Sequence, residues 1–78
     1  MKGIITTLIP IEQDEHGKLK GGFGFIRDEE GRDRFFHARD LRDFSFYDLR
    51  LQMHAEFDRQ DGGGRGNGLR AENVRVVL

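Results

Sequence analysis

Between residues 49 and 58, apolar and polar side chains alternate without interruption. Leu, Leu, Met, Ala and Phe occupy the odd positions, and Arg, Gln, His, Glu and Asp occupy the even ones. A two-residue period places all the apolar side chains on one side of an extended chain. The pattern therefore predicts a half-buried antiparallel strand over these ten residues.

Four further segments have the composition of strands, being apolar, β-branched or aromatic: residues 3–9, 23–27, 34–37 and 69–78. The first ends at Pro10, which suits the end of a strand. Residues 28–33 form a polar turn of hairpin length, whose carboxylates, such as those of Asp28 and Glu29, are expected to be solvated.

The remaining segments are expected to be loops or a short helical turn. Residues 10–22 are polar and are expected to form a loop, and residues 38–47 have room for a turn or two of helix. Residues 61–68 contain five glycines and form a long connecting loop, with a contact between Arg65 and nucleic acid as the alternative role. Five strands and one short helical turn in 78 residues predict an all-β fold, a small antiparallel barrel that forms one domain over residues 1–78.

The two short central strands carry an unusual set of aromatic residues. Because strand side chains alternate between faces, Phe23 and Phe25 share one face, and Phe35 and His37 share one face of the next strand. One pairing register places all four on the outside of the barrel and sends Ile26 and Phe36 into the core. Gly24, between the two phenylalanines, indicates tight curvature or the close approach of another backbone.

Aromatic rings beside cations form a platform for single-stranded nucleic acid, since bases stack on the rings and cations follow the phosphates. Burial of all these rings in the core is the competing interpretation, because Phe is usually buried. It is weaker here, since both faces of a single-layer barrel cannot be core. The cations expected to flank the rings are Lys18, Lys20, Arg27 and Arg39.

Composition sharpens this hypothesis. The chain has 13 Lys and Arg against 14 Asp and Glu, so its formal net charge of −1 lacks the basic excess usual for a nucleic-acid binder. Its seven Phe and one Tyr are many rings for so small a core. We therefore expect affinity to come from stacking more than from phosphate contacts, with a shallow salt dependence.

These motifs resemble the cold-shock domain family. Residues 22–26 (GFGFI) are similar to its first ribonucleoprotein motif and residues 34–37 (RFFH) to its second, while residues 1–5 resemble its opening strand and residues 71–76 its closing segment. The resemblance implies a five-stranded OB-fold that binds single-stranded RNA or DNA, with a role as an RNA chaperone or a regulator of transcription or translation. It assigns base stacking to Phe23, Phe25, Phe35 and His37, with Phe44 and Phe46 as additions.

The chain departs from the family at several positions. Thr7 and Leu8 stand where the family has a Trp-Phe pair, so one stacking ring is missing. Arg34 and Phe36 replace two valines, and Gly21 replaces a lysine. The loop that follows the first strand is longer than usual and acidic, with Glu12, Asp14 and Glu15, and the residue after His37 is Ala38, where an aromatic is common. Binding is therefore expected to be weaker than in a typical member, or differently tuned. The alternative is an OB-fold module whose aromatic face binds another protein.

Other chemistry finds little support in the sequence. No serine or cysteine lies in a nucleophile elbow or triad setting, and His16, His37 and His54, with no cysteine in the chain, make a poor metal site. An RRM fold is rejected because only a short turn separates the two aromatic motifs. We expect no enzyme activity, cofactor, metal, membrane contact or small-molecule substrate. We expect a monomer in the cytoplasm, either alone or as one domain of a longer chain.

Overall fold

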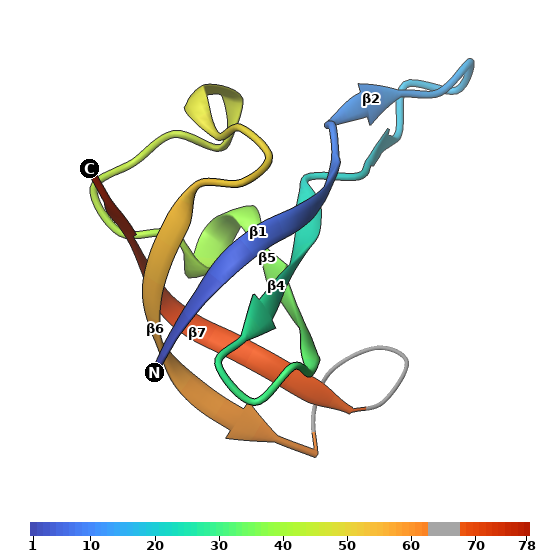
Figure 1. Cartoon of the computed structure of the whole chain (residues 1–78). Helices are drawn as coiled ribbons and strands as arrows, with labels where there is room; N and C mark the ends of the chain where they lie inside the picture. The colour runs from blue at the N-terminus through green and yellow to red at the C-terminus, as the bar shows by residue number, and fades with distance from the viewer. Residues whose placement is uncertain (63–67) are drawn as a thin grey trace.

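Five strands close into a barrel in the order β1-β4-β5-β7-β6 in the computed structural model, which describes residues 1–62 and 68–78 (Figure 1). The strands are β1 (Lys2–Ile9), β4 (Phe23–Asp28), β5 (Asp33–His37), β6 (His54–Asp61) and β7 (Leu69–Val77). The predicted all-β barrel is confirmed. The pairing is mixed rather than purely antiparallel, because β5 and β7 run parallel where Phe35 meets Arg70. A parallel pair needs a long crossover, which the chain between β5 and β7 provides.

The predicted strand over residues 49–58 is wrong in its first half. β6 begins only at His54, and residues 49–53 lie outside any strand, with a turn at 51–52. Gln52 there has a φ of 75°, which lies in the left-handed region rather than in the extended region of a regular strand. Leu49 is buried and Met53 packs against the core, whereas Leu51 is 55% exposed. The alternation in this segment thus comes from two side chains that pack on the core around a turn, not from a pleated strand.

The predicted loop over residues 10–22 contains a small hairpin. β2 (Glu12–Gln13) pairs with β3 (Leu19–Lys20), and the hairpin projects from one end of the barrel (Figure 1). The Asp14 side chain holds its turn by accepting hydrogen bonds from the backbone N–H groups of His16 and Lys18, each at 2.9 Å. Such an Asx-type contact is a recognised turn signal.

The segment after β5 contains two 3₁₀ turns instead of the single helical turn expected, η1 (Ala38–Asp40) and η2 (Phe46–Asp48). Each begins at a side-chain cap, His37 for η1 and Ser45 for η2. Within the described ranges, no helix is long and apolar enough to cross a membrane.

The core lies inside the barrel and at the end covered by η2. Its fully buried members include Ile5, Ile26, Phe36, Phe57 and Val74. The placement of Ile26 and Phe36 agrees with the predicted register. Gly24 lies beside them, and a Cβ there would collide with the carbonyl oxygen of Thr7 and the ring of Phe36. The close approach expected at this glycine is therefore confirmed.

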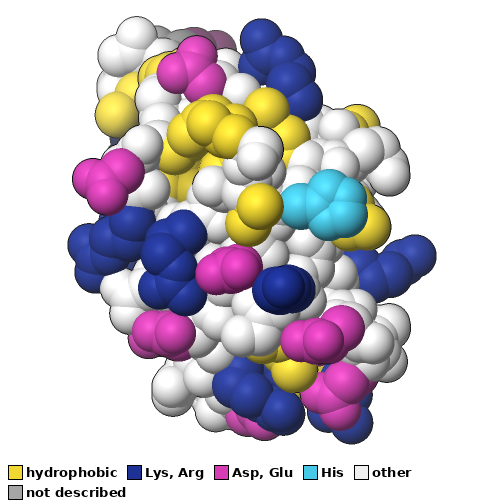
Figure 2. Space-filling model, turned by 60° about the vertical axis from the view of Figure 1, so that its left-hand side comes forward, with side chains coloured by type: hydrophobic (Ala, Val, Ile, Leu, Met, Phe, Trp, Pro, Cys, Tyr) yellow, Lys and Arg dark blue, Asp and Glu magenta, His cyan; other side chains and the backbone are white. Residues whose placement is uncertain are grey.

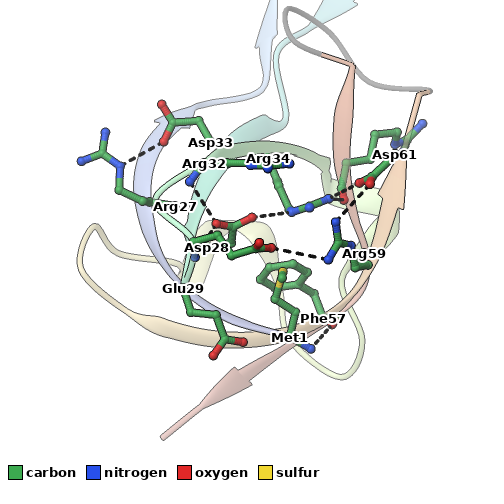
Figure 3. Close-up of polar contacts among 12 residues, drawn as sticks. Met1, Arg27, Asp28, Glu29, Arg32, Asp33, Arg34, Phe57, Arg59 and Asp61 are labelled. Atoms are coloured by element: carbon green, nitrogen blue, oxygen red, sulfur yellow. Dashed lines mark hydrogen bonds and ion pairs between the residues drawn. The ribbon is translucent and has the colours of Figure 1, made fainter.

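A charged pair is also buried in this interior. The side chains of Asp28 and Arg34 have no solvent exposure, and Arg34 Nε donates to Asp28 Oδ2 at 2.8 Å (Figure 3). Arg34 Nη1 donates to Asp61 Oδ1 at 2.9 Å, which ties the β4–β5 hairpin to the end of β6. The expectation that Asp28 is a solvated turn carboxylate is wrong, because the pleat turns Asp28 and Arg34 to the core side of their strands.

Asp28 also organises the turn that follows it. Its Oδ1 accepts the backbone N–H groups of Glu30 and Arg32, both at 2.9 Å. Burial by itself raises the pKa of Asp28, but the hydrogen bonds from Arg32, Arg34 and Glu30 outweigh it, so the pKa lies below its usual value. Hydrogen bonds from Arg34 and then Arg59 likewise lower the pKa of Asp61.

Candidate nucleic-acid interface

The register between β4 and β5 brings four ring side chains onto one surface. Phe23 pairs with His37 and Phe25 pairs with Phe35 across the two strands. The alternate positions, Gly24 with Phe36 and Ile26 with Arg34, belong to the core side. We call Phe23, Phe25, Phe35 and His37 the aromatic face.

The rings of the aromatic face differ in how deeply they are buried. The centroid of Phe35 is 5.5 Å from that of Phe23 and 6.0 Å from that of Phe25, the second pair being edge-on at 72°. Phe35 is consequently only 7% exposed, whereas Phe23, Phe25 and His37 are half-buried. The expectation of four outward rings is corrected: Phe35 packs beneath its neighbours and supports them.

Arg70 of β7 also covers Phe35, and no sequence motif singles this residue out. Its guanidinium carbon lies 5.7 Å from the centroid of Phe35. Its Nη2 pairs with Asp40 Oδ2 at 3.0 Å, and that carboxylate oxygen also accepts the backbone N–H of His37. The contact depends on the parallel pairing of β5 with β7, which no local sequence pattern predicts. The available signal is the alternation in β7, because it directs Arg70 to the side opposite the buried Ala71.

The turn η1 fixes the orientation of His37. The Nδ1 atom of His37 accepts the backbone N–H of Arg39 at 3.1 Å, while Asp40 bonds back to the His37 backbone. An Nδ1 that accepts leaves the proton of the neutral ring on Nε2. The ring therefore presents an N–H donor away from the backbone, a group suited to a base edge or a phosphate.

The four predicted cations take different places. Arg27 is on the same side of β4 as Phe23 and Phe25, and pairs with Asp33 at 3.2 Å. Arg39 is exposed as the second residue of η1. Lys18 and Lys20 are exposed on the projecting hairpin. Arg65, the alternative contact, lies outside the described residues.

No single-sign field covers the barrel surface seen in Figure 2. Lys and Arg side chains are interspersed there with Asp and Glu, and hydrophobic side chains gather at one end of that face. This distribution agrees with the net charge of −1 and gives little general attraction for phosphate on that side.

The two loop phenylalanines proposed as additions lie against the core. Phe46 is buried, with its ring centroid 6.5 Å from that of Phe36. It belongs to the core, so its assignment to the binding surface is corrected. Phe44 is half-buried and packs against the same cluster.

β1 borders the aromatic face with aliphatic and hydroxyl side chains. Thr7 pairs with Phe25 and Ile9 pairs with Phe23, while Leu8 packs on the core. Ile9 is 39% exposed. The ring that the family resemblance places at this border is thus absent, and Ile9 offers an apolar surface without a π-face.

Comparison with protein families identifies a match over most of the chain. Residues 17–77 match the family described as 'Cold-shock' DNA-binding domain. No curated protein matches the chain significantly. The matched span contains the whole aromatic face and four of the five barrel strands, while β1 and β2 precede it.

Proposed function

Because the chain belongs to the cold-shock DNA-binding domain family, we propose that it binds single-stranded RNA or DNA by stacking bases on the aromatic face. The family is a nucleic-acid-binding family rather than an enzymatic one. The observation that carries the proposal is the β4–β5 register, which gathers three rings and an imidazole on one surface of the barrel.

The half-buried rings of Phe23 and Phe25 are the stacking surfaces. Each stacked base contributes about 1–3 kcal/mol. Phe35 packs against both rings, the guanidinium of Arg70 lies over Phe35, and His37 adds a donor at the edge. Arg27 and Arg39 supply cations for the backbone, so phosphate contacts are few and the salt dependence is shallow.

Binding through base faces selects unpaired strands, because a duplex hides those faces. A domain that binds only the open form of a weak RNA hairpin shifts the hairpin toward that form by mass action. An RNA-chaperone role, or regulation of transcription or translation through such hairpins, follows from the same selectivity.

The test is a titration of the protein with a pyrimidine-rich heptamer, as RNA and as DNA, beside a duplex of the same sequence. We expect the ring resonances of Phe23 and Phe25 to shift with the single strands and not with the duplex. Ring resonances that stay unmoved at millimolar heptamer would refute the proposal. Capture of a protein partner that survives nuclease treatment would then favour the protein-interaction alternative.

A pair of variants separates stacking from packing. Phe25→Leu keeps an apolar side chain but removes the π-face, so heptamer affinity should fall by about 1–3 kcal/mol, or roughly fivefold to 150-fold. Phe46→Leu makes the same change at a buried core ring, whose centroid lies 6.5 Å from that of Phe36, and should leave affinity unchanged. Equal losses from the two variants would show that the effect is structural.

A further inference from the structure

A shallow groove opens on the outer surface of the barrel where β1 and β4 meet. It has a volume of about 210 Å³, and its lining includes Lys2, Ile4, Arg27, Glu29 and His54. Pockets that hold drug-sized molecules begin at about 300 Å³. The groove is therefore of a size for one ring and its linkage rather than for a large ligand.

The groove continues the aromatic face along the same strands. In the β1–β4 register, Ile9 and Thr7 pair with Phe23 and Phe25, and Ile4 pairs with Arg27. Arg27 lies two residues beyond Phe25 on the same side of β4, about 7 Å along the strand. Ile4 also pairs with His54 of β6 on its other side. A strand that stacks on Phe25 and runs on along β4 thus meets Arg27 and Ile4 next.

The side chains of the groove suit a base better than a cluster of phosphates. Ile4 is an apolar floor between two planar groups, the guanidinium of Arg27 and the imidazole of His54. Guanidinium planes and His rings are surfaces on which bases stack in single-stranded recognition. Lys2 adds one ammonium, and it is exposed.

Acidic neighbours limit the positive charge of the groove. Glu29 lines the groove, Glu56 of β6 is the cross-strand partner of Lys2, and Asp33 forms an ion pair with Arg27. The carboxylate of Asp28 is turned inward to Arg34, while Arg27 and Glu29 point away from that cluster (Figure 3). This balance fits one phosphate at most, beside a base.

We propose that this groove is an extension subsite for single-stranded nucleic acid, which receives the nucleotide next to the one stacked on Phe25. Its base lies on Ile4 between Arg27 and His54, and its phosphate meets Lys2. The inference rests on the proposed function, since the strand must first occupy the aromatic face.

The test compares an oligothymidine trimer, which spans the rings alone, with a heptamer. The double variant Lys2→Gln/His54→Ala changes two exposed side chains and leaves the core intact. It should weaken the heptamer several-fold, leave the trimer unchanged, and reduce the salt slope of the heptamer by about 0.7, the value for one phosphate on a single strand. Arg75→Gln, an exposed cation on β7 outside the groove, is the matched control and should change neither oligonucleotide.

NMR resonances of the wild-type protein distinguish a failure of the subsite from a failure of the proposed function. The Ile4 methyl and His54 ring signals should shift with the heptamer and stay in place with the trimer. If the heptamer moves Phe25 but leaves Ile4 and His54 unmoved, the subsite is refuted and the proposed function stands. If neither oligonucleotide moves Phe25, the proposed function fails and the subsite fails with it.

Discussion

The change Asp28→Asn should destabilise the barrel by about 3 kcal/mol, although it only replaces one carboxylate oxygen of the side chain with an NH₂ group. The asparagine oxygen still accepts the N–H groups of Glu30 and Arg32, so the turn is kept. The buried guanidinium of Arg34 loses its fully buried counter-charge and keeps only Asp61, which is half exposed. Breaking a buried pair on one side costs about 3–5 kcal/mol, and the remaining Asp61 contact places the loss at the lower end.

The same hairpin offers a matched control. Asp33 and Arg27 are also six residues apart and also joined through Nε, at 3.2 Å, but both are about half exposed. Asp33→Asn should therefore cost less than about 1 kcal/mol, as exposed ion pairs do. For a chain of 78 residues, a total stability of about 4–12 kcal/mol is expected, so the difference between the two variants is large.

Urea unfolding at pH 7, followed by far-ultraviolet circular dichroism, measures both losses, because the chain has no tryptophan to report by fluorescence. Arg34→Met and the double variant complete a double-mutant cycle, in which the double variant should lose less than the sum of the single losses. If Asp28→Asn costs no more than Asp33→Asn, or if the two changes are additive, the reasoning about the buried pair is refuted.

Two other predictions concern the same barrel. The pKa values of Asp28 and Asp61 are lowered in the folded protein. Their stabilising contribution is therefore complete above the ordinary carboxyl pKa of 3.8 and is lost as the pH falls through the lowered values. Urea midpoints measured from pH 6 to pH 2 should fall at the acid end, and a flat profile would contradict this. Gly24→Ala should cost about 1–3 kcal/mol by overpacking, because the new methyl group meets the ring of Phe36 and the Thr7 carbonyl; an unchanged urea midpoint would mean that these neighbours move aside freely.

The aromatic face could be predicted because alternation and hairpin length determine it locally. Phe23 and Phe25 must share a face wherever β4 is a strand, and a short turn leaves few registers for β5. The glycine between them marked the crowded side of the strand correctly.

The burial of Phe35 could not be predicted in the same way. It depends on Arg70, which arrives from β7 by a parallel pairing with a crossover of more than 30 residues. The turn at residues 49–53 was missed for a related reason. Leu49 and Met53 pack on a core that distant strands build. The apolar residues around this turn happen to be spaced two apart, which is the spacing expected of a strand.

The departures from the family pattern divide according to the side of the sheet they occupy. On the core side, Phe36 fills the space that Gly24 leaves open, and Arg34 is met by Asp28 and Asp61. These substitutions have partners of matching shape or charge, so they change the interior without opening it.

On the outer side, Thr7 beside Phe25 has no compensating ring, since the next outward residue of β1 is the aliphatic Ile9. The core substitutions are therefore compensated within the barrel, whereas the proposed binding surface lacks one ring relative to the family pattern. A matching test is Thr7→Trp, which restores a ring next to Phe25. It should raise heptamer affinity by about 1–3 kcal/mol, the contribution of one stacked base, and leave the urea midpoint nearly unchanged. An unchanged affinity in a folded variant would show that the strand does not pass over this border of the face.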